Sequence, residues 1–171
     1  MEPSEYIILL DDGGVMNDNL KRGSQWQRWV GELFADRYGG KPELWAEANK
    51  KVIDNIIEMY ASLHRNPDVD YETSNGELNR RWVEGMFLLA GHTPPPRSEH
   101  EEIVYSTAKY VTPRVRAAFP GVVESIRALH RMGFTLHTAS GEDTIDLHGY
   151  LTGMGVRPLF SRLYGKNLIN T

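Results

Sequence analysis

The spacing of apolar and polar residues changes twice along this 171-residue chain. Near the start, the apolar run Ile7–Leu10 is too short for a helix and ends at two aspartates and two glycines. This pattern predicts a buried strand followed by a turn. From about residue 20 to 112, apolar residues recur at helical spacing in four segments. One break between these segments is polar and turn-rich, HRNPDVDYETSNG at residues 64–76.

The pattern changes again after Pro120. The expected elements are a helix at 121–133, a strand at 134–139, a helix at 142–155 and a short strand at 162–165. This order predicts an α/β fold, a Rossmann-like parallel sheet with a helical domain inserted after its first strand. Right-handed connections would bring the ends of the first two strands, at 11–14 and 140–141, to the same carboxyl edge of the sheet, where open α/β folds bind ligands.

Composition narrows the class of protein without naming a function. The net charge is -4 and the pI about 5.9, so we expect neither nucleic acid nor an anionic membrane as partner. The chain has no cysteine, which excludes disulfides and thiol catalysis and suits a reducing compartment. We see no signal peptide and no apolar run long enough to cross a bilayer, and we therefore expect a cytoplasmic domain.

The two predicted loops carry groups suited to phosphoryl transfer. Asp11 could act as a nucleophile or ligate a hard cation such as Mg²⁺, and the backbone of Gly13 and Gly14 could turn inward to bind an anion. Ser140 and Gly141 precede a helix, whose N-terminus also favours an anion. From spacing alone, however, Asp-Asp-Gly-Gly is equally an ordinary turn, and Ser140 is more often a helix N-cap than a ligand.

Two longer stretches resemble a known family. The segment IILLDDGGVMND is similar to the first motif of the haloacid dehalogenase-like (HAD) hydrolase superfamily, and FPGVVESIRALHRMGFTLHTASG resembles the region that leads into its second motif. Residues 159–171 resemble the strand that precedes the third motif. The helical insertion lies where the family places a mobile cap. By this resemblance, residues 1–18 and 115–171 form the core and residues 19–114 the helical cap.

The resemblance implies roles for particular residues. Asp11 would be the catalytic nucleophile, forming an aspartyl-phosphate, and would ligate Mg²⁺ together with the backbone carbonyl of Gly13. The substrate phosphate would bind at Ser140, Gly141, Asp12 and Gly13. Asp18 matches a frequent acidic position near the cap hinge.

Two departures from the family pattern affect the expected activity. Gly13 stands where the family's phosphatases carry a second aspartate, the general acid and base. Since general acid catalysis contributes about two to four decades in rate, an ordinary phosphomonoesterase activity should be slow. The family's third-motif lysine and fourth-motif acidic pair would fall beyond Thr171, and Lys166 lies too early to be that lysine. We therefore expect a core truncated at its C-terminus, which could leave the chain inactive.

Three functions follow as hypotheses. The first is a Mg²⁺-dependent phosphatase that acts on a small phosphorylated metabolite. The second is dehalogenase-type hydrolysis of a carbon–halogen bond, in which Asp11 attacks carbon and needs neither metal nor acid. The third is a catalytically silent HAD-fold interaction module. In each case the opening strand would lie at a sheet edge, where a homodimer or swapped dimer could cover it.

Overall fold

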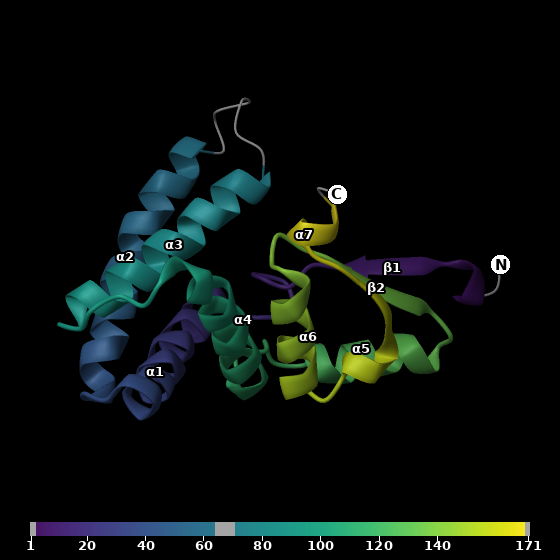
Figure 1. Cartoon of the computed structure of the whole chain (residues 1–171). Coiled ribbons are helices and arrows are strands. Elements are labelled where there is room, and N and C mark those ends of the chain that lie inside the picture. The colour runs from purple at the N-terminus through teal and green to yellow at the C-terminus, as the bar shows by residue number, and fades with distance from the viewer. Residues whose placement is uncertain (1–2, 64–70, 170–171) are drawn as a thin grey trace. The chain divides into compact units, whose positions relative to one another are not determined.

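The structure, a computed structural model of the whole chain, describes residues 3–63 and 71–169 (Figure 1). These residues divide into two compact units. The first, here called the core unit, comprises residues 1–26 and 108–171, and the second, the helical unit, comprises residues 27–107. The boundaries between the units fall inside two helices, α1 (Asn19–Tyr38) and α4 (His100–Val111).

A three-stranded parallel sheet forms the centre of the core unit. Its strands are β1 (Ile7–Leu10), β2 (Thr135–Ala139) and β3 (Phe160–Tyr164), in the order β1-β2-β3. The connections between β2 and β3 include α6 (Thr144–Gly153), and α5 (Val122–Arg131) precedes β2 (Figure 1). The α/β fold with a parallel sheet is therefore as predicted.

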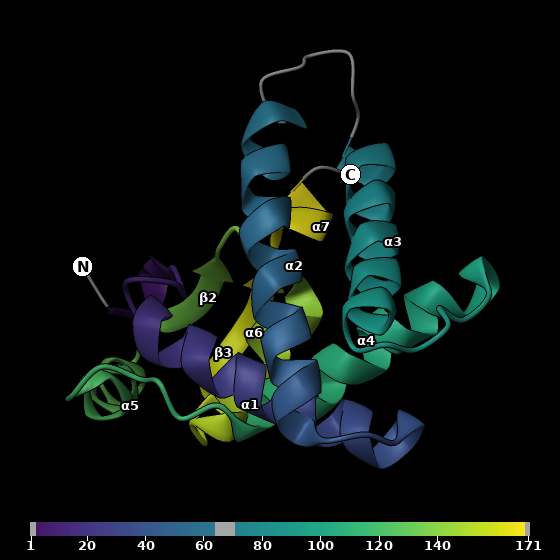
Figure 2. The same ribbon diagram turned by 90° about the vertical axis from the view of Figure 1, so that its left-hand side faces the viewer.

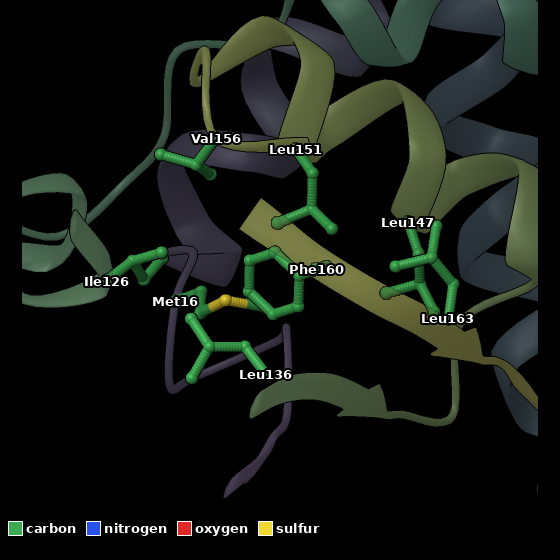
Figure 3. Packing of buried hydrophobic residues seen from close by; sticks show 8 residues of the cluster. All are labelled: Met16, Ile126, Leu136, Leu147, Leu151, Val156, Phe160 and Leu163. Atoms are coloured by element: carbon green, nitrogen blue, oxygen red, sulfur yellow. The ribbon is translucent and has the colours of Figure 1, made fainter. Parts of the chain in front are cut away.

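A hydrophobic cluster between the sheet and its helices holds the core unit together. Leu136 of β2, Phe160 of β3 and Met16 of the loop after β1 meet at its centre (Figure 3). The buried members are Met16, Ile126, Leu136, Leu147, Leu151, Val156, Phe160 and Leu163. Burying a side chain of this size contributes about 1.5–3 kcal/mol, so the cluster fixes the positions of the strand ends that carry the candidate site.

Strand β1 lies at the edge of the sheet, as expected. Ile8 and Leu10 pack against the hydrophobic cluster, whereas Ile7 and Leu9 are 59% and 58% exposed. Because β1 pairs on one side only, with β2, its other side presents unpaired backbone groups within the described part of the chain.

The helical unit is built around α2 (Pro42–Leu63) and α3 (Tyr71–Leu89), which lie side by side as a hairpin (Figures 1 and 2). Its core is aromatic, since Phe34 of α1 packs against Trp45 of α2 and Trp82 of α3. The Trp82 indole N–H also donates to Asn49 Oδ1 at 2.8 Å. Trp45 and Trp82 are both buried in this core.

Two local predictions need correction or completion. Helix α3 begins at Tyr71, so residues 71–76 are helical and not part of a break; residues 64–70 lie outside the described residues. Packing of α3 through Leu78 and Trp82 outweighs the turn preferences of this polar stretch. A short last helix, α7 (Lys166–Ile169), was not expected. None of the helices in the described parts of the chain has the length and apolar character needed to span a bilayer.

Candidate active site at the carboxyl ends of the first two strands

The loop after β1 is a compact turn held by the backbone carbonyl of Asp12. The N–H groups of Met16 and Asn17 donate to this oxygen at 2.8 and 2.9 Å, and the N–H of Gly14 donates back to the Asn17 carbonyl at 2.8 Å. Gly14 has a φ of +79°, a conformation that side chains rarely adopt, which explains a glycine at this position. These hydrogen bonds and the Gly14 conformation define the shape of the loop.

Asp11 lies at the mouth of this loop, directly after β1. Its side chain is exposed, and its Oδ1 accepts a 2.7 Å hydrogen bond from the backbone N–H of Asp12. Among the described residues, no cationic side chain forms an ion pair with Asp11. The carboxylate is thus oriented by the backbone and available for a substrate or a cation.

Asp12 has a different environment from its neighbour. Its carboxylate is fully buried and accepts from Asn17 Nδ2 at 2.8 Å and from Arg22 Nη1 at 2.7 Å. Burial raises the pKa of Asp12, against the hydrogen bond from Asn17 and the charge of Arg22. Because these partners occupy the carboxylate, and the backbone N–H of Asp12 donates to Asp11 Oδ1, a part for Asp12 in phosphate binding stays a prediction.

The second loop follows β2 and carries Ser140 and Gly141. Ser140 is 6% exposed, its N–H donates to the Tyr164 carbonyl at 3.1 Å, and its Oγ lies 3.4 Å from the N–H of Glu142. The residue that precedes α6 is Asp143, so Ser140 does not act as the N-cap of this helix. Gly141 is exposed beside it.

The register of the sheet brings the two loops together. Leu10 of β1 pairs with Thr138 of β2 in a parallel ladder, so Asp11 and Ser140 both follow the same edge of the sheet within two residues of a paired position. This is the juxtaposition expected from the right-handed connection between the strands. Asp11, Asp12 and Gly13 thus lie in one loop, and Ser140 and Gly141 lie in the loop beside it.

The space next to Gly13 is already filled. A Cβ atom at this position would lie 2.9 Å from Asn19 Oδ1 and 3.3 Å from Arg22 Nη2. An aspartate here, as in the family's phosphatases, would require the Asn19 side chain to move. Asn19 and Arg22 therefore occupy the region in which a side chain at position 13 would begin.

Asp18 follows the first loop and precedes α1. Asp18 Oδ1 accepts from the N–H groups of Leu20 and Lys21 and so caps the N-terminus of α1. The N–H of Asp18 donates to the Ala117 carbonyl at 2.9 Å. Asp18 and Ala117, which lie in the core unit on the two segments that lead to the helical unit, are therefore neighbours.

Lys166 and Asp143 form an ion pair at the second loop. Lys166 Nζ lies 3.5 Å from Asp143 Oδ2, and its N–H donates to the Glu142 carbonyl at 3.0 Å. Asp146 lies in the first turn of α6 and is half-buried, and its Oδ1 is buried without a hydrogen-bond partner among the described residues. Burial, together with the charges of Glu142 and Asp143, raises the pKa of Asp146 to about 7.

Arg22, which is not among the predicted site residues, joins the two loops. Its Nη1 donates to Asp12 Oδ2 and its Nη2 to Glu142 Oε1, both at 2.7 Å. A signal was present, because a carboxylate at the end of a buried strand requires a cationic or hydrogen-bonding partner. Lys21 and Arg22 are the first basic residues after that strand.

Comparisons with known proteins agree with this geometry at the level of the fold. No protein-family model and no curated protein matches the chain. Among solved structures, it is similar to magnesium-bound YfnB from Bacillus subtilis, a protein assigned to the HAD-hydrolases, with a TM-score of 0.59 and 14% identity over 94% of this chain and 63% of that one. It is also similar to the L-2-haloacid dehalogenase from Xanthobacter autotrophicus with chloropropionic acid covalently bound, with a TM-score of 0.52 and 11% identity over 100% of this chain and 59% of that one.

The chain therefore has a HAD-like fold, and the predicted resemblance is confirmed at that level. It spans about three fifths of the length of these two structures. Identities of 11–14% carry no information on substrate.

The described residues could supply a part of the ligands that a magnesium ion needs. Asp11 offers an exposed carboxylate, and the backbone hydrogen bonds of the loop are made to the carbonyls of Asp12 and Asn17, which leaves that of Gly13 available. Within the described residues, no three His, Asp or Glu side chains converge on a metal position. Mg²⁺ is commonly held by one or two carboxylates, waters and substrate phosphate, and this donor set fits that mode.

Proposed function

We propose that this chain is a HAD-like hydrolase that acts on a small phosphorylated metabolite with Mg²⁺, and that Asp11 is its nucleophile. The observation that carries the proposal is the pairing of β1 with β2, which places the exposed carboxylate of Asp11 beside the loop of Ser140. A carboxylate, a hydroxyl and backbone N–H groups that can bind an anion, here those of Gly13 and Gly141, are the elements that phosphoryl transfer requires.

In this proposal each group has a defined part. An oxygen of the Asp11 carboxylate forms a bond to phosphorus while the bond from phosphorus to the leaving oxygen breaks, and water then hydrolyses the aspartyl-phosphate to inorganic phosphate. The Ser140 hydroxyl and the backbone N–H groups of Gly13 and Gly141 donate to the phosphoryl oxygens. Asp11 and the Gly13 carbonyl would hold Mg²⁺, which supplies charge neutralisation when bound.

The nature of residue 13 sets the preferred substrates. A glycine cannot donate a proton to an alkoxide, and loss of a general acid typically lowers the rate by about 10²–10⁴. The leaving group of an acyl phosphate is a carboxylate, which needs no proton to leave. We therefore propose that the chain favours acyl phosphates or esters with acidic leaving groups over alkyl phosphates.

Residues 19–114 would act as the cap that selects the substrate, with Asp18 at the start of one of its connections. Caps of this kind exclude water and complete the site when they close. The covering of the β1 edge by a second copy of the chain is a further part of the proposal, since exposed strand edges promote association. A cytoplasmic location also stays a prediction.

A second candidate function is hydrolysis of a carbon–halogen bond. The absence of a carboxylate at position 13 favours it, because attack of Asp11 on carbon with loss of a halide needs neither an acid nor a metal. The similarity to a dehalogenase that carries a covalently bound chloropropionic acid is compatible with this chemistry.

Hydrolysis assays separate these functions. We expect the full chain to hydrolyse acetyl phosphate faster than p-nitrophenyl phosphate, to require Mg²⁺ and to lose activity in Asp11→Asn. Release of chloride from 2-chloropropionate without Mg²⁺ would support the dehalogenase instead. If no substrate is turned over and Asp11→Asn binds as the unmodified chain does, the catalytically silent interaction module is favoured.

A further inference from the structure

Arg22 forms ion pairs with one carboxylate from each of the two loops. It lies in the first turn of α1, its side chain is 15% exposed, and it joins Asp12 of the first loop to Glu142 of the second. The two carboxylates are 130 residues apart in the chain, and each receives one nitrogen of the same guanidinium group at 2.7 Å. A planar guanidinium can serve two carboxylates in fixed directions, whereas an ammonium group cannot fix both.

Each partner of Arg22 is hydrogen-bonded, through its backbone N–H, to a side chain of the candidate site. The backbone N–H of Asp12 donates to Asp11 Oδ1 at 2.7 Å, and the backbone N–H of Glu142 lies 3.4 Å from Ser140 Oγ. Arg22 therefore holds the two residues whose backbone orients the proposed nucleophile and the proposed phosphate-binding hydroxyl. A shift of Arg22 would be transmitted to the spacing between Asp11 and Ser140.

The guanidinium group is itself held in place from its other side. Its central carbon lies 5.3 Å from the centre of the Tyr150 ring, and the Tyr150 hydroxyl accepts a hydrogen bond from the Trp26 indole. The carboxylates of Glu142 and Asp12 keep the pKa of Arg22 above its usual value in spite of burial. The group is thus permanently charged and confined by packing, as a rigid support requires.

We propose that Arg22 is a positioning residue of the Asp11 site, which sets the distance between the Asp11 and Ser140 loops by binding Asp12 and Glu142 together. This inference rests on the proposed function in so far as it concerns catalysis. It assigns Arg22 no contact with substrate. Its effect should therefore fall on the chemical step and not on substrate binding alone.

The first test measures turnover of acetyl phosphate by the full chain with Mg²⁺. We expect Arg22→Gln to lower kcat by about 10- to 100-fold with little change in KM, because small displacements of reacting groups have effects of this size. Arg22→Lys should recover only a part, since it restores the charge but not the fork. Arg28→Gln is the matched control, because Arg28 lies on the same helix, is 68% exposed and pairs only with Glu32 among the salt bridges of the described chain. Arg28→Gln should have the same kcat and KM as the unmodified chain.

The second test needs no activity and uses the absence of cysteine from the chain. A pair of substitutions, Asp11→Cys and Ser140→Cys, introduces two thiols, and their disulfide equilibrium in a glutathione buffer reports the effective concentration of one loop at the other. We expect Arg22→Gln, added to this pair, to lower that effective concentration severalfold, whereas Arg28→Gln should leave it unchanged. Circular dichroism checks that each variant is folded.

The two tests distinguish failure of this inference from failure of the proposed function. If the unmodified chain turns over acetyl phosphate and Arg22→Gln matches it in kcat, or if the thiol pair is unaffected by Arg22→Gln, the positioning role is overturned. If the unmodified chain has no activity but Arg22→Gln lowers the effective concentration of the thiol pair, the proposed function fails. The role of Arg22 in setting the loop distance then stands.

Discussion

Asp146 provides a prediction whose size follows from the structure. The Oδ1 atom of its carboxylate is buried and has no hydrogen-bond partner among the described residues. Burial and the charges of Glu142 and Asp143 raise its pKa to about 7 from an ordinary value of 3.8, while Lys166 and Arg22 oppose the increase. At about 1.36 kcal/mol per pKa unit, this difference corresponds to about 4 kcal/mol of lost stability once Asp146 is ionised in the folded chain.

The direction of the pH dependence follows from the raised pKa. Below about pH 4, Asp146 is protonated in the folded and unfolded chain alike, and its full contribution to stability is present. Between about pH 4 and 7 only the unfolded chain releases the proton, so the free energy of unfolding falls as the pH rises. Above pH 7 the loss is complete. Asp146→Asn cannot ionise, and its free energy of unfolding should lack this fall.

Urea unfolding at several pH values between 4 and 8.5 tests this prediction. The NMR signals of the Leu136 and Leu163 amides report the core unit, which contains Asp146, separately from the helical unit. The stability of Asp146→Asn relative to the unmodified chain should increase by about 4 kcal/mol across this range. Asp54→Asn, an exposed site on α2, should follow the unmodified chain. A difference in the free energy of unfolding between Asp146→Asn and the unmodified chain that is constant with pH would show that Asp146 does not titrate with a raised pKa in the folded chain.

Three further predictions concern the site and the sheet edge. Gly13→Asp combined with Asn19→Ala, which removes the oxygen 2.9 Å from the new Cβ, should speed hydrolysis of an alkyl phosphate by about 10²–10⁴ and leave acetyl phosphate little changed; equal rates with Asn19→Ala alone would contradict it. Asp12→Ala leaves the charge of Arg22 short of a partner and should destabilise the core unit by about 3 kcal/mol in urea unfolding, and a loss below about 0.5 kcal/mol would contradict this. If two copies associate through β1, lysines in place of the exposed Ile7 and Leu9 should convert a dimer to a monomer in light scattering, and a monomeric unmodified chain would refute the association.

The strands of the core unit could be predicted because their signals are local. An apolar run that ends in aspartates and glycines at residue 11, and a second that ends at Ser140, specify strands and the loops after them. The handedness of the connections then places both loops at one edge. The approximate helix boundaries followed from the same reasoning, except that packing extended α3 back to Tyr71 and that the short helix α7 was not expected.

The electrostatic arrangement at the site could not be predicted in this way. Asp12 and Glu142 are brought together by folding, and no local pattern indicates that one arginine serves both. The raised pKa of Asp146 likewise depends on burial by the elements around it and on charges from Glu142, Asp143, Lys166 and Arg22. Pairing of this kind depends on side-chain directions in the folded chain and not on spacing along it.

Mass spectrometry can establish whether Asp11 becomes phosphorylated during turnover. The full chain is incubated with acetyl phosphate and Mg²⁺, quenched in acid and digested, and the peptides are analysed for a phosphoryl group. The account predicts a phosphoryl group on Asp11 that is absent from Asp11→Asn and from samples without Mg²⁺. Turnover of acetyl phosphate with no phosphoryl group on Asp11, or with one on another residue, would contradict it.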